Sequence, residues 1–213
     1  MISLEQYVKN PCGLLSIPYY KARRMGTPAG VRVVHARDFH GDVADDETDT
    51  PYFRLRHDLH ALDQSALPGA YRMGTLDRHH AAQLAALLET CYQGLTLTPE
   101  AAEAMRTEAF AFASAQLGAW TRAGTLVGCC LGTFDAQARE GVVDWLAVHP
   151  LHRRKGIARA LVNACVEAYI GYADFMTVSG QVDNPSHPEA VYRKCGFTGG
   201  DVWHVLVQKE ESR

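Results

Sequence analysis

The sequence has no apolar run that approaches the roughly 20 residues of a membrane span, and its first ten residues, MISLEQYVKN, lack the apolar region of a secretory signal. Its six cysteines form no C-x-x-C pair, which argues against a zinc site or a disulfide framework and predicts reduced, mostly buried thiols. The formal net charge of −3 offers no broad basic surface for nucleic acid or an anionic membrane. These absences predict a soluble, cytoplasmic protein with no metal and no nucleic-acid or membrane partner.

Hydrophobic residues make up 47% of the 213-residue chain, which is enough to build a sizeable core. Residues 1–69 are rich in Pro, Gly, His and Asp, whereas a regular pattern of helix and strand signals follows. We therefore predict an N-terminal extension over 1–69 that packs on a core domain over 70–213. Within the extension, 31–39 and 51–59 are strand-like runs expected to extend the sheet, and the acidic, turn-rich stretch 40–50 predicts a solvated loop.

The periodicities of the predicted core domain indicate alternating helices and strands. Thr98 is the expected N-cap of the second helix, and Ala123-Gly124 is the expected turn of a hairpin. The order β-α-α-β-β-β-α-β-α-β predicts an α/β fold with a mixed sheet and helices on both sides. The predicted segments are 70–77, 78–93, 98–113, 118–135 (two strands), 141–148, 157–169, 174–182, 187–196 and 201–208.

The stretch HRRKGIARAL, residues 152–161, places three basic residues and a glycine directly before an apolar-periodic helix. A helix start leaves up to four backbone N–H groups without intrahelical partners, and none of the preceding side chains can accept from them as an N-cap does. Gly156 lets the backbone approach a ligand closely, while the helix dipole and the basic residues add positive charge. The stretch suits a phosphate or pyrophosphate, although a solvent-exposed helix start with a basic patch fits this stretch equally well.

Two longer segments, VVDWLAVHPLHRRKGIARALV and NPSHPEAVYRKCGF, closely resemble the GCN5-related N-acetyltransferase (GNAT) superfamily. The family pattern Arg/Gln-x-x-Gly-x-Gly/Ala matches Arg153 to Ala158, and the pattern Tyr-x-Lys-x-Gly-Phe matches Tyr192 to Phe197. The resemblance covers about residues 70–208. It implies a GNAT-like acyl-CoA N-acyltransferase fold with an N-terminal extension, and it implies acetyl-CoA as the co-substrate.

The resemblance also implies roles for individual residues. The strand edge at 146–148 would pair with the pantetheine arm and polarise the thioester carbonyl, the loop at 153–158 would wrap the pyrophosphate, and Tyr192 would be the acid for the leaving thiolate. Asn184 would lie near the pantetheine, but it precedes Tyr192 by eight residues where many members have seven. The cofactor-binding residues implied in this way are Leu146, Ala147, Val148, Arg153, Arg154, Lys155, Gly156, Ile157, Ala158 and Asn184.

Asp144 is the candidate base, because it interrupts an apolar run predicted to be buried on both faces, where a carboxylate is costly unless paired, hydrogen-bonded or protonated. On a regular strand it shares a face with Val142, Leu146 and Val148, beside the implied thioester contacts. An ordinary Asp, with a pKa of about 3.9, is a poor base for an alkyl amine, so burial would have to raise its pKa or a water relay would have to help. A purely structural carboxylate is the alternative.

Histidines offer competing assignments. His187 lies near the predicted Tyr192 helix and is an alternative base. His149 and His152 form a His-x-x-His pair that can bind metal, but no third ligand accompanies them, so no metal site is predicted.

These patterns together predict an acetyl-CoA-dependent N-acetyltransferase that acts by direct attack of a primary amine of a small molecule or of a free amino group. Two alternatives stay open: a CoA-binding regulatory module without turnover, and an acetyltransferase for a protein N-terminus or tRNA. The net charge weighs against tRNA. The sequence leaves a homodimer open and names neither the acceptor nor the acyl chain.

Overall fold

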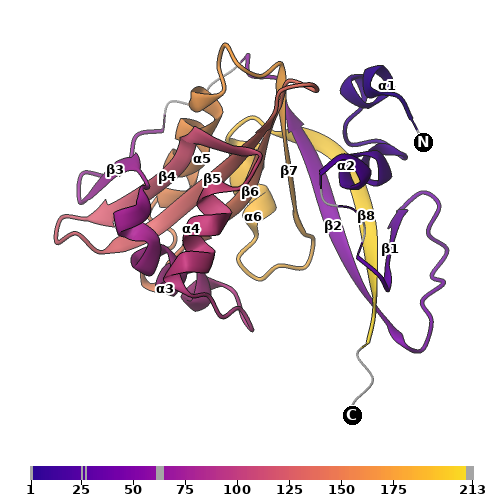
Figure 1. The fold of residues 1–213 in the computed structure, drawn as a ribbon, viewed down its shortest axis with the longest axis horizontal. Coiled ribbons are helices and arrows are strands. Elements are labelled where there is room, and N and C mark those ends of the chain that lie inside the picture. The colour runs from indigo at the N-terminus through magenta and orange to yellow at the C-terminus, as the bar shows by residue number, and fades with distance from the viewer. Residues whose placement is uncertain (1, 25, 27, 61–64, 210–213) are drawn as a thin grey trace. The chain divides into compact units, whose positions relative to one another are not determined.

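The computed structural model describes residues 2–24, 26, 28–60 and 65–209 (Figure 1). The chain divides into two compact units. The first unit comprises Met1–Arg56, Thr177–Ala190 and Phe197–Arg213, and the second comprises His57–Met176 and Val191–Gly196. These two units do not coincide with the predicted extension over 1–69 and core domain over 70–213, and that division stays a prediction.

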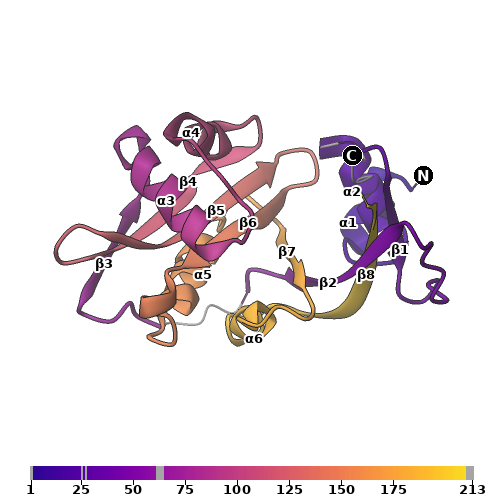
Figure 2. The same ribbon diagram turned by 90° about the horizontal axis from the view of Figure 1, so that it is seen from below.

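The second unit is built on four neighbouring strands in the order β6-β5-β4-β3, each antiparallel to the next. Figure 2 shows α3 and α4 on one side of β4, β5 and β6, and α5 on the other side. The hairpin between β4 and β5 turns at Gly124, whose φ of 89° confirms the predicted glycine turn. The elements are β3 (Tyr71–Thr75), η1 (Arg78–His80), α3 (Ala81–Cys91), α4 (Pro99–Thr107), β4 (Ala111–Thr121), β5 (Leu126–Asp135), β6 (Glu140–Val148), η2 (Pro150–His152) and α5 (Ile157–Ala168).

Two different kinds of packing hold these helices on the sheet. On the α3 side, large apolar side chains such as Leu84, Leu88 and Trp120 form a buried cluster with Leu131 and Ala147. On the α5 side, glycines let the helix lie close to the strands. A Cβ at Gly128 would lie only 3.0 Å from side-chain carbons of Ile157 and Leu161. The α5 start, which carries the predicted anion site, is therefore seated directly on β5.

The first unit contains a three-stranded antiparallel arrangement in which β8 (Thr198–Gln208) pairs with both β1 (Val31–His35) and β2 (Glu47–His57). Helices α1 (Leu4–Lys9) and α2 (Ser16–Arg24) precede these strands. Buried Arg54 of β2 links them, because its guanidinium donates to the Pro11 carbonyl and the Tyr7 hydroxyl. In addition, β7 (Phe175–Gln181) and α6 (Pro188–Lys194) each include residues of both units.

The structure confirms the α/β fold class and the predicted element order from residue 70. It also confirms that 31–39 and 51–59 contribute strands that join a sheet, and that the cysteines are free thiols, all buried except Cys91. Within the described residues, no helix is both long enough and apolar enough to pass through a bilayer.

The secondary structure departs from the sequence predictions in three places. The acidic stretch 40–50 is not entirely a loop, because its last four residues, from Glu47, belong to β2. The helix predicted over 98–113 ends at Thr107, because Ala111 already pairs with Thr133 of β5 and sheet pairing overrides the helical preference of the alanines. Helices α1 and α2 were not predicted at all.

Candidate functional site

The start of α5 is open, as the sequence predicts. Its N-cap residue is Gly156, with a φ of 85°, and no side chain caps the helix. Arg154, two residues earlier, also has a left-handed φ of 61°. Residues 153–156 are exposed, so the loop that leads into the helix presents three basic residues to solvent. An uncapped, basic helix start of this kind is the arrangement that the sequence predicts, and its role toward an anion stays a prediction.

Two of the three basic side chains are tethered to the loop that carries them. The Arg153 Nε donates to the Val148 carbonyl at 3.0 Å, and the Lys155 Nζ donates to the Leu151 carbonyl at 3.1 Å. The Arg153 guanidinium also lies near the Cys91 thiol, whose pKa is raised by burial although the positive charge of the guanidinium opposes that shift. Arg153 thus connects the loop to the end of α3 and β6, a structural contact that the sequence did not predict.

The two histidines of this loop contact each other, and His152 also has a partner on β3. The His152 Nδ1 lies 3.0 Å from the Tyr71 hydroxyl, and the rings of His149 and His152 are 5.7 Å apart. Burial lowers the pKa of His152, and Lys155 and His149 lower it further. In the part of the chain that the structure describes, no three His, Cys, Asp or Glu side chains are grouped to hold a metal ion.

Strand β6 carries a β-bulge at Asp144. Trp145 lies opposite Leu131 and Val143 lies opposite Gly132, so Asp144 is the extra residue. The prediction of a buried carboxylate is wrong, because the Asp144 residue is exposed.

The bulge also changes the side-chain alternation along β6. Val142 is opposite Thr133 and Leu146 is opposite Cys130, which are three residues apart on β5 and therefore face opposite ways. The prediction that Val142, Asp144, Leu146 and Val148 share one face is wrong for this reason.

The ladder between β5 and β6 fixes which backbone groups of β6 point outward. The His149 N–H donates to the Val127 carbonyl at 2.9 Å. Because bonded and non-bonded pairs alternate in an antiparallel ladder, Ala147 is bonded to β5, whereas the N–H and C=O groups of Leu146 and Val148 point away from it. Of the three residues predicted over 146–148, only Leu146 and Val148 therefore direct their backbone N–H and C=O groups away from β5, to the side of β6 on which β7 is the next strand of the sheet.

Both outward carbonyls accept a hydrogen bond from a side chain of the second unit. The Tyr92 hydroxyl donates to the Leu146 carbonyl at 2.9 Å, and Arg153 donates to the Val148 carbonyl. Sequence analysis missed Tyr92, because its position directly after the apolar face of a helix gives no local sign of a partner on β6.

Tyr192, on α6, is buried with 5% of its surface exposed. Burial raises its pKa well above the ordinary value, and the neighbouring groups Cys130 and Tyr92 raise it further. The next residue but two, Cys195, donates through its Sγ to the Arg159 carbonyl of α5 at 3.7 Å. Tyr192 therefore keeps its proton and is held in the second unit together with the open start of α5.

Asn184 and His187 belong to the first unit. The Asn184 Oδ1 accepts from the Ser186 N–H at 2.9 Å and from the Ser186 hydroxyl at 2.6 Å, so this oxygen already supports a local turn. His187 is exposed and has a left-handed φ of 50°. Their roles toward a cofactor stay predictions.

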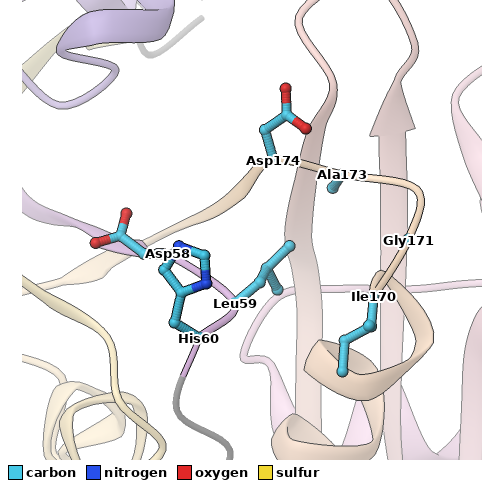
Figure 3. A pocket seen from close by; sticks show the side chains of 7 residues that line it. All are labelled: Asp58, Leu59, His60, Ile170, Gly171, Ala173 and Asp174. Carbon is cyan, nitrogen blue, oxygen red and sulfur yellow. The ribbon is translucent and has the colours of Figure 1, made fainter.

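The second unit also contains a hollow of about 420 Å³ that is lined by other residues than the predicted site residues (Figure 3). One of its acidic residues, Asp174, pairs with the Arg139 Nε at 2.8 Å. No predicted site residue lines this hollow, whose walls are formed by Asp58, Leu59, His60, Ile170, Gly171, Ala173 and Asp174.

The matched part of the sequence decides the family. A sequence model described as "Acetyltransferase (GNAT) domain" matches residues 111–199, which include the bulged strand, the open helix start and Tyr192. Residues 111–199 form a domain of the GNAT superfamily. No curated protein matches this chain in sequence.

Solved structures share the GNAT fold at low sequence identity. A GCN5-related N-acetyltransferase from Sphaerobacter thermophilus is 17% identical, with a TM-score of 0.61 over 90% of this chain and 55% of that one. A tandem GNAT protein from the clavulanic acid biosynthesis pathway is 20% identical, with a TM-score of 0.57 over 80% of this chain and 56% of that one. The ribosomal-protein-S18-alanine N-acetyltransferase from Escherichia coli is 12% identical, with a TM-score of 0.51 over 67% and 96%. This chain thus spans about half the length of the first two.

Proposed function

We propose that this chain is an acetyl-CoA-dependent N-acetyltransferase that acts on a primary amine of a small molecule or on a free amino group. The observation that carries the proposal is the open, basic start of α5, which follows directly on the outward edge of β6 in the same unit. We also propose a cytoplasmic location. The net charge of −3 supports a small-molecule partner over nucleic acid.

The residues present fit the charged end of CoA. The backbone from Arg154 to Ala158 would hold the pyrophosphate through its N–H groups, since Arg154 and Gly156 already adopt left-handed conformations and no cap competes. Acetyl-CoA supplies the activated acetyl group. The N–H groups of Leu146 and Val148 would donate hydrogen bonds to carbonyl oxygens of the pantetheine arm and of the thioester.

In the reaction, the amine nitrogen forms a bond to the thioester carbon, the carbon–sulfur bond breaks, and the electron pair leaves on the sulfur. Tyr192 would donate a hydrogen bond to that sulfur, because its raised pKa keeps it protonated. An alkyl amine with a pKa of about 10.4 must lose a proton before it attacks. Exposed Asp144 would attract the ammonium group and accept the proton of that group through a water molecule.

The test is thiol release from acetyl-CoA across a panel of small amines, amino acids and peptides with free N-termini. We expect at least one acceptor to raise release above background, and Tyr192→Phe to lower kcat by about 100-fold with the Kd of CoA unchanged. Asp144→Asn should lower kcat by about tenfold. If CoA binds tightly and no acceptor raises release, the chain is a CoA-binding module without turnover.

The pH dependence of stability tests the environment of Tyr192. Its folded-state pKa is raised, so its effect on stability is constant below the unfolded value of about 10 and turns unfavourable as the pH rises above that. Melting temperatures of the wild type should therefore fall above pH 10, and less steeply in Tyr192→Phe. Tyr172→Phe, at an exposed tyrosine, is the control and should retain the wild-type slope.

A further inference from the structure

The edge of β6 after the bulge presents an unusual set of groups. The carbonyls of Leu146 and Val148 point outward, and each already accepts from a side chain, Tyr92 and Arg153 respectively. An incoming extended ligand ordinarily finds alternating donors and acceptors on a strand edge. Because both carbonyls already accept a hydrogen bond, we expect a ligand at this part of β6 to meet the N–H groups of Leu146 and Val148, which favours a ligand carbonyl oxygen over a ligand amide N–H group.

Tyr92 is well placed to keep this edge in one orientation. It is the C-cap residue of α3, and its ring meets the Trp145 ring edge-on at 5.2 Å between centroids. Trp145 directly follows the bulge, and Leu146 follows Trp145. Burial raises the pKa of Tyr92, so its hydroxyl remains a donor across the physiological range. The ring and the hydroxyl thus hold two successive residues of the strand.

We propose that Tyr92 is a positioning residue for the acyl group: by holding the Leu146 carbonyl, it aims the Leu146 N–H at the carbonyl oxygen of a bound thioester. The proposal rests on the function proposed above. It assigns to Tyr92 an effect on the acyl carbonyl alone, and none on the distant pyrophosphate, because the bond it makes lies at the bulge end of the edge.

The test compares two ligands in calorimetry with Tyr92→Phe, which keeps the ring and removes the hydroxyl. One ligand is CoA, which has no acyl carbonyl. The other is the analogue of acetyl-CoA in which a methylene replaces the sulfur, so that the carbonyl stays and cannot be transferred. We expect the Kd of the analogue to rise five- to tenfold and the Kd of CoA to change less than twofold. With an active acceptor, kcat should fall about tenfold.

Tyr169→Phe is the matched control, since the buried Tyr169 hydroxyl also donates to a strand carbonyl, that of Thr133, at 2.7 Å. It should lower the melting temperature and leave both Kd values unchanged. If Tyr92→Phe raises the Kd values of both ligands equally, or changes neither Kd, Tyr92 is merely structural and the proposal is overturned. If the wild type binds neither ligand, the proposed function itself fails.

Discussion

Two helix starts in the same unit are built in opposite ways. At the start of α4, the Thr98 hydroxyl accepts from the Ala101 N–H at 3.2 Å, Pro99 occupies the first turn, and Glu100 follows. At the start of α5, Gly156 supplies no side chain, no acidic residue stands in the first turn, and basic residues precede it. The first start satisfies one backbone donor with a side-chain cap and places negative charge near the positive end of the helix dipole, whereas the second start has neither feature.

The open start carries a cost in stability that the closed one avoids. A side-chain cap contributes about 1 kcal/mol, and a non-glycine residue in the left-handed region costs about 1 kcal/mol. Arg154 adopts such a conformation with a φ of 61°. The missing cap and the left-handed arginine both lower stability, as expected for a helix start with the binding role that we propose.

The largest expected effect comes from closing the open start with negative charge. Gly156→Glu places a carboxylate at the proposed pyrophosphate position and a side chain at a φ of 85°, so CoA affinity should fall by at least about 100-fold. Calorimetry measures the loss. Gly124→Glu is the control, because Gly124 has a φ of 89° and open space around it. It should cost similar stability without affecting CoA binding. Equal affinity in the Gly156 variant and the wild type would exclude our placement of the pyrophosphate.

Removal of the side-chain cap at the start of α4 should lower stability without changing CoA binding. Thr98→Ala removes the cap of α4 and should lower the free energy of unfolding by about 1 kcal/mol in urea titrations. The Kd of CoA should stay within twofold of the wild type. A change in CoA affinity comparable to that of the Gly156 variant would show that the two helix starts do not have separate roles.

The smallest effect should separate strain from charge. Arg154→Gly relieves the left-handed arginine and should raise the free energy of unfolding by about 0.5 kcal/mol, after allowance for the greater freedom of glycine when unfolded. Loss of one cationic group should at the same time raise the Kd of CoA about fivefold, most clearly at low salt. Opposite signs in the two measurements support a binding role. A loss of stability together with unchanged affinity would assign Arg154 to the fold.

Sequence reasoning succeeded where the signal was local. The missing cap at Gly156 and the glycine turn at Gly124 each depend on a few adjacent residues, and both were predicted. It failed where a distant strand decided the outcome. The alanine-rich run after Thr107 has a helical preference, yet Ala111 pairs with Thr133 of β5. Asp144 interrupts an apolar run, yet it is exposed because the register of β6 against β5 leaves it in a bulge.

The amino-acid order was therefore enough for the element order, the α/β class, the family resemblance and the uncapped helix start, because helix caps, turns and apolar periodicity act over one or two turns of chain. The direction of the Leu146 and Val148 carbonyls, and the donors that reach them, required the folded chain. Those features depend on strand register and on Tyr92 meeting a carbonyl 54 residues further along, a contact that only the packing of α3 against β6 creates.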